Sequence, residues 1–263
     1  MSRPCTPPTV GDQITARLTG FLLTTAAREL VSRFVEAEQQ AVLPLLLEVL
    51  ELEAQERHER RITRLRRASK LPPGKTFETL NEGRLPPALV RRLHEIAEGD
   101  FLEDATNVLA FGLPGVGKSH AMCAVGHALV DRGHAVLFMP TYSLVQELLA
   151  AKRNLELPRA LRKLDHFAVL LLDDVGYIQQ SPEEAEILFT LLAERYERRS
   201  VCITSNLIFA QWDRIFRDQM ATAAAIDRLV HHSVLLEFDV PSFRTEHAKR
   251  RGKAAASRSE APS

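Results

Sequence analysis

The pattern of hydrophobic and polar residues divides the chain into two parts. Over residues 12–70, apolar residues recur at helical spacing and no glycine follows Gly20, which predicts a helical segment. From about residue 100 to 240, short apolar runs alternate with longer amphipathic stretches. The expected strands are 107–111, 135–139, 168–172, 200–204 and 233–238, and the expected helices are 119–131, 143–152, 158–165, 182–198, 209–216 and 221–231. This alternation predicts an α/β fold, with a mostly parallel sheet covered by helices on both faces.

Proline and glycine residues and changes in charge indicate where the expected domains begin and end. Residues 1–70 form an N-terminal helical extension, in which Pro44 fits the first turn of a new helix. Pro72-Pro73-Gly74 ends that region and opens a linker over residues 71–98, the last part of which reads as a short helix at 88–98. The α/β core follows at 99–245, and residues 246–263 are expected to be a disordered basic tail.

Residues 112–119 match the phosphate-loop pattern G-x-x-x-x-G-K-[ST] at every fixed position. An expected strand precedes the loop and an expected helix follows it, which is the context that the motif requires. Glycines let backbone N–H groups turn toward phosphates, the lysine supplies a positive charge, and the serine hydroxyl suits Mg²⁺. The pattern predicts ATP and Mg²⁺ as ligands. The residues expected to bind the nucleotide are Gly112, Pro114, Gly115, Val116, Gly117, Lys118, Ser119 and His120.

Two further strands end in polar residues. The apolar run at 168–172 is followed by Asp173 and Asp174, and the run at 200–204 leads to Asn206. Because ligands of open α/β sheets bind beyond the carboxyl ends of the strands, we expect all three side chains near the phosphates. Asp173 is assigned to the magnesium ion together with Ser119, Asp174 to the attacking water, and Asn206 to sensing that water or the γ-phosphate. The alternative is that these are ordinary strand-end and turn residues.

The amino-acid composition excludes few classes of function. Lys plus Arg and Asp plus Glu both total 34, so net charge does not indicate nucleic acid. The three cysteines lack disulfide or metal spacing, the N-terminus has no secretory apolar region, and no apolar run reaches about 18 residues. We therefore expect a cytoplasmic protein with no membrane partner.

Charge is concentrated in one stretch: Arg57 to Lys75 contains eight basic residues and one acidic one. Five of them form a single helical stripe: Arg57, Arg60, Arg61, Arg64 and Arg67. Such a stripe is suited to DNA phosphates without reading sequence. It is equally compatible with a solvated face, because the glutamates that precede it can pair with it at i, i+4.

Taken together, these motifs resemble those of AAA+ ATPases and, within that class, the IstB-like helpers of insertion-sequence transposases. The segments that carry the resemblance lie at 97–101, 107–109, 173–177, 195–199, 204–206, 211–212, 225–232 and 242–244, within roughly residues 30–245. The resemblance implies a transposase and double-stranded DNA as partners. It also implies that Arg228 is a finger completing a neighbouring subunit's site in a homo-oligomer, and that Arg244 contacts the nucleotide phosphates.

The sequence departs from the family pattern at one position, and several alternative functions stay open. AAA+ enzymes usually have glutamate where this chain has Asp174, so slow hydrolysis is expected. A helicase loader of the DnaC type shares the core motifs, while a small-molecule kinase or a non-hydrolysing adaptor would respond to no DNA. His231 and His232 are expected to be packing or helix-end residues rather than metal ligands, and Trp212 a packing residue.

Overall fold

The computed structural model describes residues 7–176, 181–207, 211–212, 226–227 and 229–242. The chain divides into two compact units, Met1–Thr63 and Arg64–Ser263, which are described separately. Of the expected elements, the helix at 209–216, most of that at 221–231 and the tail at 246–263 lie outside the described residues. Within them, no helix is both long enough and apolar enough to cross a membrane.

The N-terminal unit is helical, as the spacing of its apolar residues predicts. It contains α1 (Val10–Gly20), α2 (Thr24–Glu36), the short 3-10 turn η1 (Gln40–Val42) and the first part of α3 (Leu43–Ser69). Pro44 lies in the first turn of α3, where its missing N–H costs no intrahelical hydrogen bond. Ile14, Leu18 and Leu43 are buried at the centre, with Leu30 and Phe34 of α2 packed against them.

The second unit is built on a five-stranded parallel sheet in the order β2-β3-β4-β1-β5. The strands are β1 (Asn107–Gly112), β2 (Val136–Pro140), β3 (Val169–Val175), β4 (Ser200–Ser205) and β5 (Ser233–Phe238). The helices are α4 (Pro87–Glu98), α5 (Lys118–Asp131), α6 (Thr141–Arg153), α7 (Leu157–Asp165) and α8 (Pro182–Arg195), with 3-10 turns η2 (Phe77–Thr79), η3 (Glu82–Arg84) and η4 (Asp100–Leu102).

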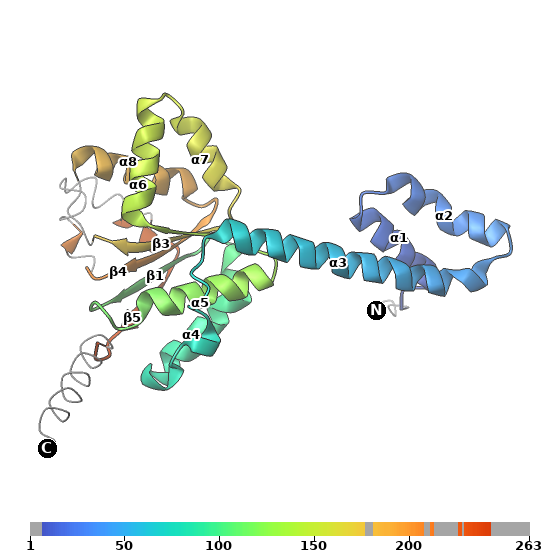
Figure 1. Ribbon diagram of the computed structural model, residues 1–263, viewed down its shortest axis with the longest axis horizontal. Coiled ribbons are helices and arrows are strands. Elements are labelled where there is room, and N and C mark those ends of the chain that lie inside the picture. The colour runs from blue at the N-terminus through green and yellow to red at the C-terminus, as the bar shows by residue number, and fades with distance from the viewer. Residues whose placement is uncertain (1–6, 177–180, 208–210, 213–225, 228, 243–263) are drawn as a thin grey trace, which may run out of the picture. The chain divides into compact units, whose positions relative to one another are not determined.

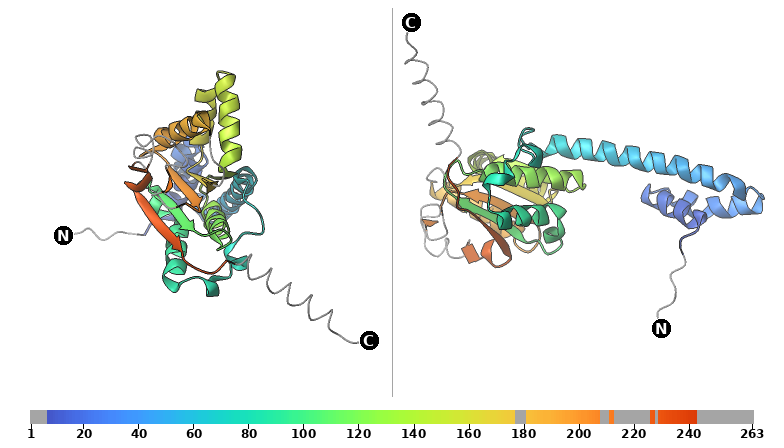
Figure 2. Two further views of the ribbon diagram at one scale, coloured as in Figure 1. Left: turned by 90° about the vertical axis from the view of Figure 1, so that its left-hand side faces the viewer. Right: turned by 90° about the horizontal axis from the view of Figure 1, so that it is seen from below.

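The helices cover both faces of this sheet, with α6, α7 and α8 on one side and α4 and α5 on the other (Figures 1 and 2). Successive strand residues point to opposite faces. In β1, Leu109 and Phe111 therefore join the cluster beneath α6 and α8, whereas Val108 and Ala110 join the cluster beneath α4 and α5. Burial on both faces explains why the strands read as continuous apolar runs.

The segment expected as a linker, residues 71–98, packs into the core of the second unit instead. Leu71, Leu85, Leu89 and Leu93 are buried in the cluster beneath α4 and α5. The proline pair at 86–87 caps and opens α4, a position where proline fits a helix. The division between units falls inside α3, between Thr63 and Arg64.

A buried arginine holds together the edge of the sheet at which β4 begins. Arg195, at the end of α8, is 1% exposed and donates hydrogen bonds to the carbonyls of Leu164, Phe167, Ala168 and Ser200. Burial lowers the pKa of this guanidinium to about 10, against the opposing effect of Asp165, so it stays charged at neutral pH. Four carbonyl acceptors offset its desolvation and tie α7, β3, α8 and β4 together.

Candidate functional site

The phosphate loop joins β1 to α5 at the carboxyl edge of the sheet. Gly112, Gly115 and Gly117 have φ values of 153°, 82° and 102°, a region that other residues rarely adopt. At Gly112, a Cβ would lie 2.5 Å from the carbonyl oxygen of Phe238 at the end of β5. Only glycine therefore fits there, and the start of the loop is fixed against the neighbouring strand.

Lys118 begins α5 and is 5% exposed. Its Nζ donates hydrogen bonds to the carbonyls of Gly112 (2.7 Å) and Leu113 (3.0 Å), so the ammonium group is held over the loop. Ser119, half-buried, follows in the first turn of the helix, where free N–H groups and the helix dipole favour anions. A positive charge, a hydroxyl and a helix N-terminus thus meet at one place.

The other loop residues differ in exposure. The side chain of Val116 is fully buried among the apolar residues beneath α5, so it faces the core rather than a ligand. Pro114 is exposed. The Nε2 atom of His120 lies 3.0 Å from the hydroxyl of Thr79 and 3.2 Å from the carbonyl oxygen of Thr76. Its ring thus joins α5 to residues 76–79, a contact that the motif alone does not reveal.

Asp173 is positioned by a neighbouring strand. It is 8% exposed, and its Oδ1 accepts a hydrogen bond of 2.5 Å from the hydroxyl of Thr204 in β4. The same hydroxyl accepts the backbone N–H of Asp174 at 2.9 Å. Thr141 donates its hydroxyl to the Asp173 carbonyl at 2.8 Å. Sequence reasoning missed both threonines; the available signal was a hydroxyl residue just before the Ser205-Asn206 strand end.

Asp174 is exposed, unlike its neighbours, because the backbone changes direction there. Its φ is 57°, and the pairing of β3 with β4 shifts between Leu172 and Val175. A bulge of this kind redirects a side chain, and aspartate tolerates left-handed backbone better than most residues. The two adjacent carboxylates therefore occupy different environments, one buried and hydrogen-bonded and the other exposed.

Asn206 follows β4 and is half-buried. Within the described residues, its buried Oδ1 has no hydrogen-bond partner. Most buried polar atoms have one, so this oxygen is available to a ligand or water. Ser205, beside it, donates its hydroxyl to the Val175 carbonyl at 2.8 Å, which joins the ends of β3 and β4. Trp212 is fully buried and donates to the Leu207 carbonyl, which confirms it as a packing residue.

The arginine stripe lies on α3, and all five of its members are exposed. Arg57 pairs with Glu53 and lies over the Phe21 ring, and Arg60 pairs with Glu56, both at i, i+4. Across the described part of the chain, Arg64 and Arg67 have no ion pair, and Arg61 has an interaction of its own. Arg228, expected to be the finger, and Arg244, expected to contact the phosphates, both lie outside the described residues.

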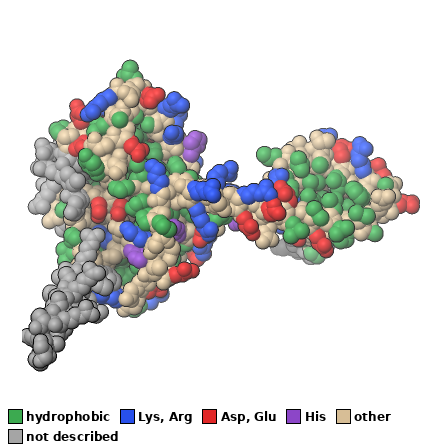
Figure 3. Space-filling view, viewed as in Figure 1, with side chains coloured by type: hydrophobic (Ala, Val, Ile, Leu, Met, Phe, Trp, Pro, Cys, Tyr) green, Lys and Arg blue, Asp and Glu red, His purple; other side chains and the backbone are tan. Residues whose placement is uncertain are grey.

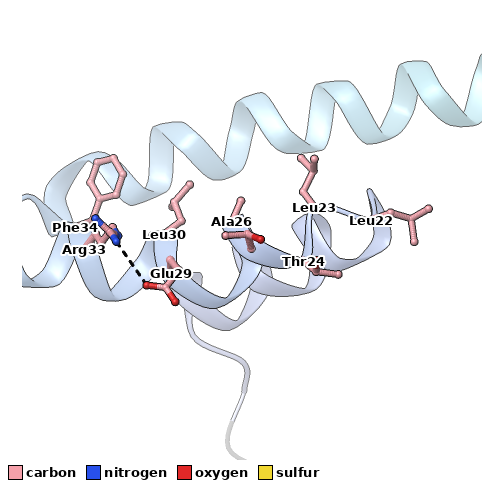
Figure 4. A pocket seen from close by; sticks show the side chains of 9 residues that line it. Leu22, Leu23, Thr24, Ala26, Glu29, Leu30, Arg33 and Phe34 are labelled. Atoms are coloured by element: carbon pink, nitrogen blue, oxygen red, sulfur yellow. Dashed lines mark ion pairs between the residues drawn. The ribbon is translucent and has the colours of Figure 1, made fainter.

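A second candidate site is an apolar groove of about 710 Å³ in the N-terminal unit. Figure 4 shows Leu23, Leu30 and Phe34 pointing toward α3, while Leu22 points away. Hydrophobic side chains also gather on the visible face of this unit (Figure 3). Along α3, Leu45, Val49 and Leu52 are exposed at i, i+4 and i+7.

Comparisons with known proteins also indicate an ATP-binding site. Residues 15–251 match the family described as IstB-like ATP binding protein. The chain is 44% identical over 213 residues to an insertion sequence ATP-binding protein of Sinorhizobium fredii, covering 79% of this chain and 72% of the relative. It is 39% identical over 196 residues to the ATP-binding protein of insertion sequence IS21 of Pseudomonas aeruginosa, covering 74% of each.

Among solved structures, the chain is similar to AMPPCP-bound DnaA from Aquifex aeolicus. The TM-score is 0.52 at 18% identity, covering 65% of this chain and 51% of DnaA. At that identity the likeness shows the fold alone. Together with the parallel sheet, it confirms the predicted α/β fold of the AAA+ phosphate-loop type, and the family match confirms the resemblance inferred from the motifs.

The position of Asp173 generates a first prediction. Replacing Thr204 with valine removes the hydroxyl that orients this carboxylate, while Thr204→Ser keeps it. We expect Thr204→Val to lower ATP turnover about tenfold to a hundredfold, the usual cost of losing a residue that orients a metal ligand. The Mg²⁺ concentration for half-maximal turnover should rise as well, measured in steady-state assays at saturating ATP.

The control is Thr190→Val on α8, which removes a hydroxyl that donates to the Glu186 carbonyl. Unfolding in denaturant, measured for each variant, separates lost stability from lost turnover. An unchanged Mg²⁺ requirement in a folded Thr204→Val protein would contradict the assigned role of Asp173.

Proposed function

The chain belongs to the family of IstB-like ATP binding proteins, and from this premise we propose that it is an ATPase that assists a transposase. ATP would bind at the carboxyl edge of the sheet and join subunits into an oligomer on double-stranded target DNA. Hydrolysis would then reset the assembly. The observation that carries the proposal is that the carboxyl ends of the neighbouring strands β1, β4 and β3 bring three groups to one edge of the described sheet. They are the Lys118 ammonium, the oriented Asp173 carboxylate and the Asn206 oxygen, which has no partner among the described residues.

The residues at this edge fit a magnesium–nucleotide complex. The buried Asp173 carboxylate and the Ser119 hydroxyl are hard oxygen donors of the kind that Mg²⁺ prefers. The ion would neutralise charge on the transferred phosphoryl group. Lys118 would hold the β- and γ-phosphates, and the N–H groups of Gly115 and Gly117 would line the phosphate tail. Arg244 would add a contact to the phosphates.

Asp174 and Asn206 are assigned to the attacking water. Asp174 is exposed at the sheet edge, where its carboxylate would orient and polarise that water. The Asn206 oxygen would hold the water on its other side or sense the γ-phosphate. Since aspartate is one methylene shorter than the usual glutamate, its reach is shorter and turnover should be slow.

We propose that Arg228 completes the site of a neighbouring subunit. A planar, permanently charged guanidinium suits a γ-phosphate whose charge must be stabilised in the transition state. Arg228→Ala should therefore leave ATP binding intact and remove DNA-stimulated hydrolysis. The measurement is ATP turnover with and without duplex DNA, with assembly size followed by light scattering in the same samples.

Mixing two inactive variants tests the shared site directly. Lys118→Ala removes nucleotide binding but leaves Arg228, whereas Arg228→Ala has an intact phosphate loop. A mixture should regain part of the DNA-stimulated turnover, because each intact loop would meet an intact arginine from its neighbour. Turnover that survives in Arg228→Ala alone would refute the shared site. A constant monomer with no response to DNA would favour a small-molecule kinase or an inert adaptor.

The arginine stripe of α3 is the proposed DNA-binding surface, and Arg64 and Arg67 are its test positions. The double reversal Arg64→Glu/Arg67→Glu should weaken binding of every duplex sequence alike. It should also reduce the slope of log affinity against log salt by about 2, because each of the two arginines would neutralise one phosphate. Fluorescence anisotropy with two unrelated duplexes over a range of salt concentrations measures both effects.

The matched control is Arg159→Glu/Arg162→Glu on α7, an equal charge change on another exposed helix. If both double variants change affinity and slope equally, the effect comes from net charge and the stripe does not bind DNA.

The apolar groove of the N-terminal unit is the proposed transposase-docking surface. The names of the two relatives favour a transposase over a replicative helicase as the partner. An amphipathic helix would fit a groove lined by Leu23, Ala26, Leu30 and Phe34, with Glu29 and Arg33 offering polar contacts on its rim.

Leu22→Glu should abolish co-purification with the transposase of the same mobile element while leaving ATP turnover unchanged. Leu22 also lines the groove, is 85% exposed and has a φ of 63°. Its matched control is Leu155→Glu in the second unit, a leucine that is 92% exposed with a φ of 58°. Equal capture of the transposase by both variants would place the docking surface elsewhere.

A further inference from the structure

Three potential metal ligands lie together at the edge of the sheet opposite the phosphate loop. A carboxylate oxygen of Glu197 and one ring nitrogen each of His231 and His232 lie within 4.8 Å of one another, and all three residues are exposed. Glu197 lies in the turn between α8 and β4, and His232 immediately precedes β5. No spacing pattern in the sequence indicates this group, because its carboxylate and its imidazoles come from distant segments of the chain.

The backbone on the histidine side of this cluster is fixed from the core. Asn107, at the start of β1, donates its N–H to the His232 carbonyl at 2.7 Å and its side-chain amide to the Leu229 carbonyl at 3.2 Å. The N–H of His231 bonds to the Asp227 carbonyl at 2.9 Å. The two imidazoles are therefore carried by a segment that these hydrogen bonds hold in place.

The backbone on the glutamate side is equally constrained. The carbonyl of the buried Arg195 accepts the N–H groups of both Arg198 and Arg199 at 3.0 Å, which closes the turn around Glu197. Glu197 has a φ of 55°, a strained conformation for a residue other than glycine. The structure thus presents this carboxylate from a tight, anchored turn, and strain of this kind is common at ligand sites.

A tyrosine sets the orientation of one imidazole. The hydroxyl of Tyr196 lies 3.1 Å from Nδ1 of His231, so Nε2 is the nitrogen left to face an ion. Metal-binding histidines in proteins nearly always have such a partner on the other ring nitrogen. The rings of His231 and His232 meet edge-on with centroids 4.4 Å apart, which places their nitrogens close together.

We propose that Glu197, His231 and His232 bind a divalent transition-metal ion, with Zn²⁺ the best fit. Two imidazole nitrogens and one carboxylate oxygen form a ligand set typical of zinc, with water completing the coordination. Mg²⁺ and Ca²⁺ prefer oxygen ligands throughout and fit poorly. The bound ion would connect the turn after α8 to the segment that leads into β5.

The competing explanation is that Tyr196, His231 and His232 only pack as an aromatic group. Measuring zinc binding by the full-length, nucleotide-free chain distinguishes a metal site from aromatic packing alone. A Cys5→Ser background removes the one thiol that lies outside the described residues. The other two thiols, Cys123 and Cys202, compete little because burial raises the pKa of each to about 12.

Isothermal titration with ZnCl₂ in metal-free buffer should give one equivalent per chain. His232→Ala and Glu197→Gln should each weaken this binding by about tenfold or more. Tyr196→Phe should also weaken it by about tenfold, because His231 then loses the partner that orients its ring. Titration with Co²⁺ should produce visible absorption bands from the same site, and these should disappear in His232→Ala.

The matched control is His94→Ala, which breaks another exposed pair, formed by His94 and Glu82 at 2.8 Å. That variant should bind zinc like the parent. The site is refuted if the parent takes up no zinc, if His232→Ala and Glu197→Gln leave affinity unchanged, or if His94→Ala lowers it as much. Thermal unfolding of each metal-free variant shows that the fold is intact.

Discussion

All five strands run in one direction, and the arrangement of the second unit depends on that constraint. Parallel strands require crossover helices, so the carboxyl ends of the strands meet at one edge of the sheet and the amino ends at the other. Gly112, Asp173 and Asn206 are brought together at the first edge although they are far apart in sequence. At the second edge, Asn107 and Arg195 bond the starts of β1, β3 and β4 to neighbouring segments. The hydrogen bonds at the second edge help to fix how the strands are aligned with one another. That alignment in turn determines where Gly112, Asp173 and Asn206 lie at the first edge.

Much of the fold could be predicted from the short apolar runs in the sequence, because a strand that is buried on both faces contains few polar residues. The phosphate loop could be predicted as well, since its backbone conformation requires the glycines and its ligand requires the lysine.

The features that sequence reasoning missed depend on pairing between distant segments of the chain. The partner of Asp173 is Thr204, which is identified only once β3 and β4 are known to be neighbours. Prolines interrupt residues 71–98 and so predict a linker, yet Leu71 and Leu93 are buried through tertiary contacts. For the same reason, the sequence does not connect the two adjacent histidines before β5 with Glu197.

The ion pairs of α3 do not argue against a role in DNA binding. Exposed i, i+4 pairs such as Arg57–Glu53 and Arg60–Glu56 contribute little to stability, because water and salt screen the two charges. Neutralising a DNA phosphate releases a condensed counterion, which offsets the loss of so weak a pair at moderate salt. The pairs instead orient Arg57 and Arg60 along the helix. Arg64 and Arg67, which have no ion pair in the described part of the chain, are the members of the stripe whose charge a phosphate would meet uncompensated.

The strand β5 links the two edges of the sheet. It begins next to His232 and ends at Phe238, whose carbonyl oxygen leaves no room for a Cβ at Gly112. Along the chain, Arg228 precedes this strand by five residues, and the far end of the strand lies against the start of the phosphate loop. A force applied near the start of β5 by a neighbouring subunit would be carried along a strand paired with β1 over its whole length. Because Gly112 lies against the end of that strand, a displacement of β5 would act on the start of the loop. This gives the proposed dependence of hydrolysis on assembly a physical route through the protein, and a metal ion held by His231 and His232 would stiffen the same route at its beginning.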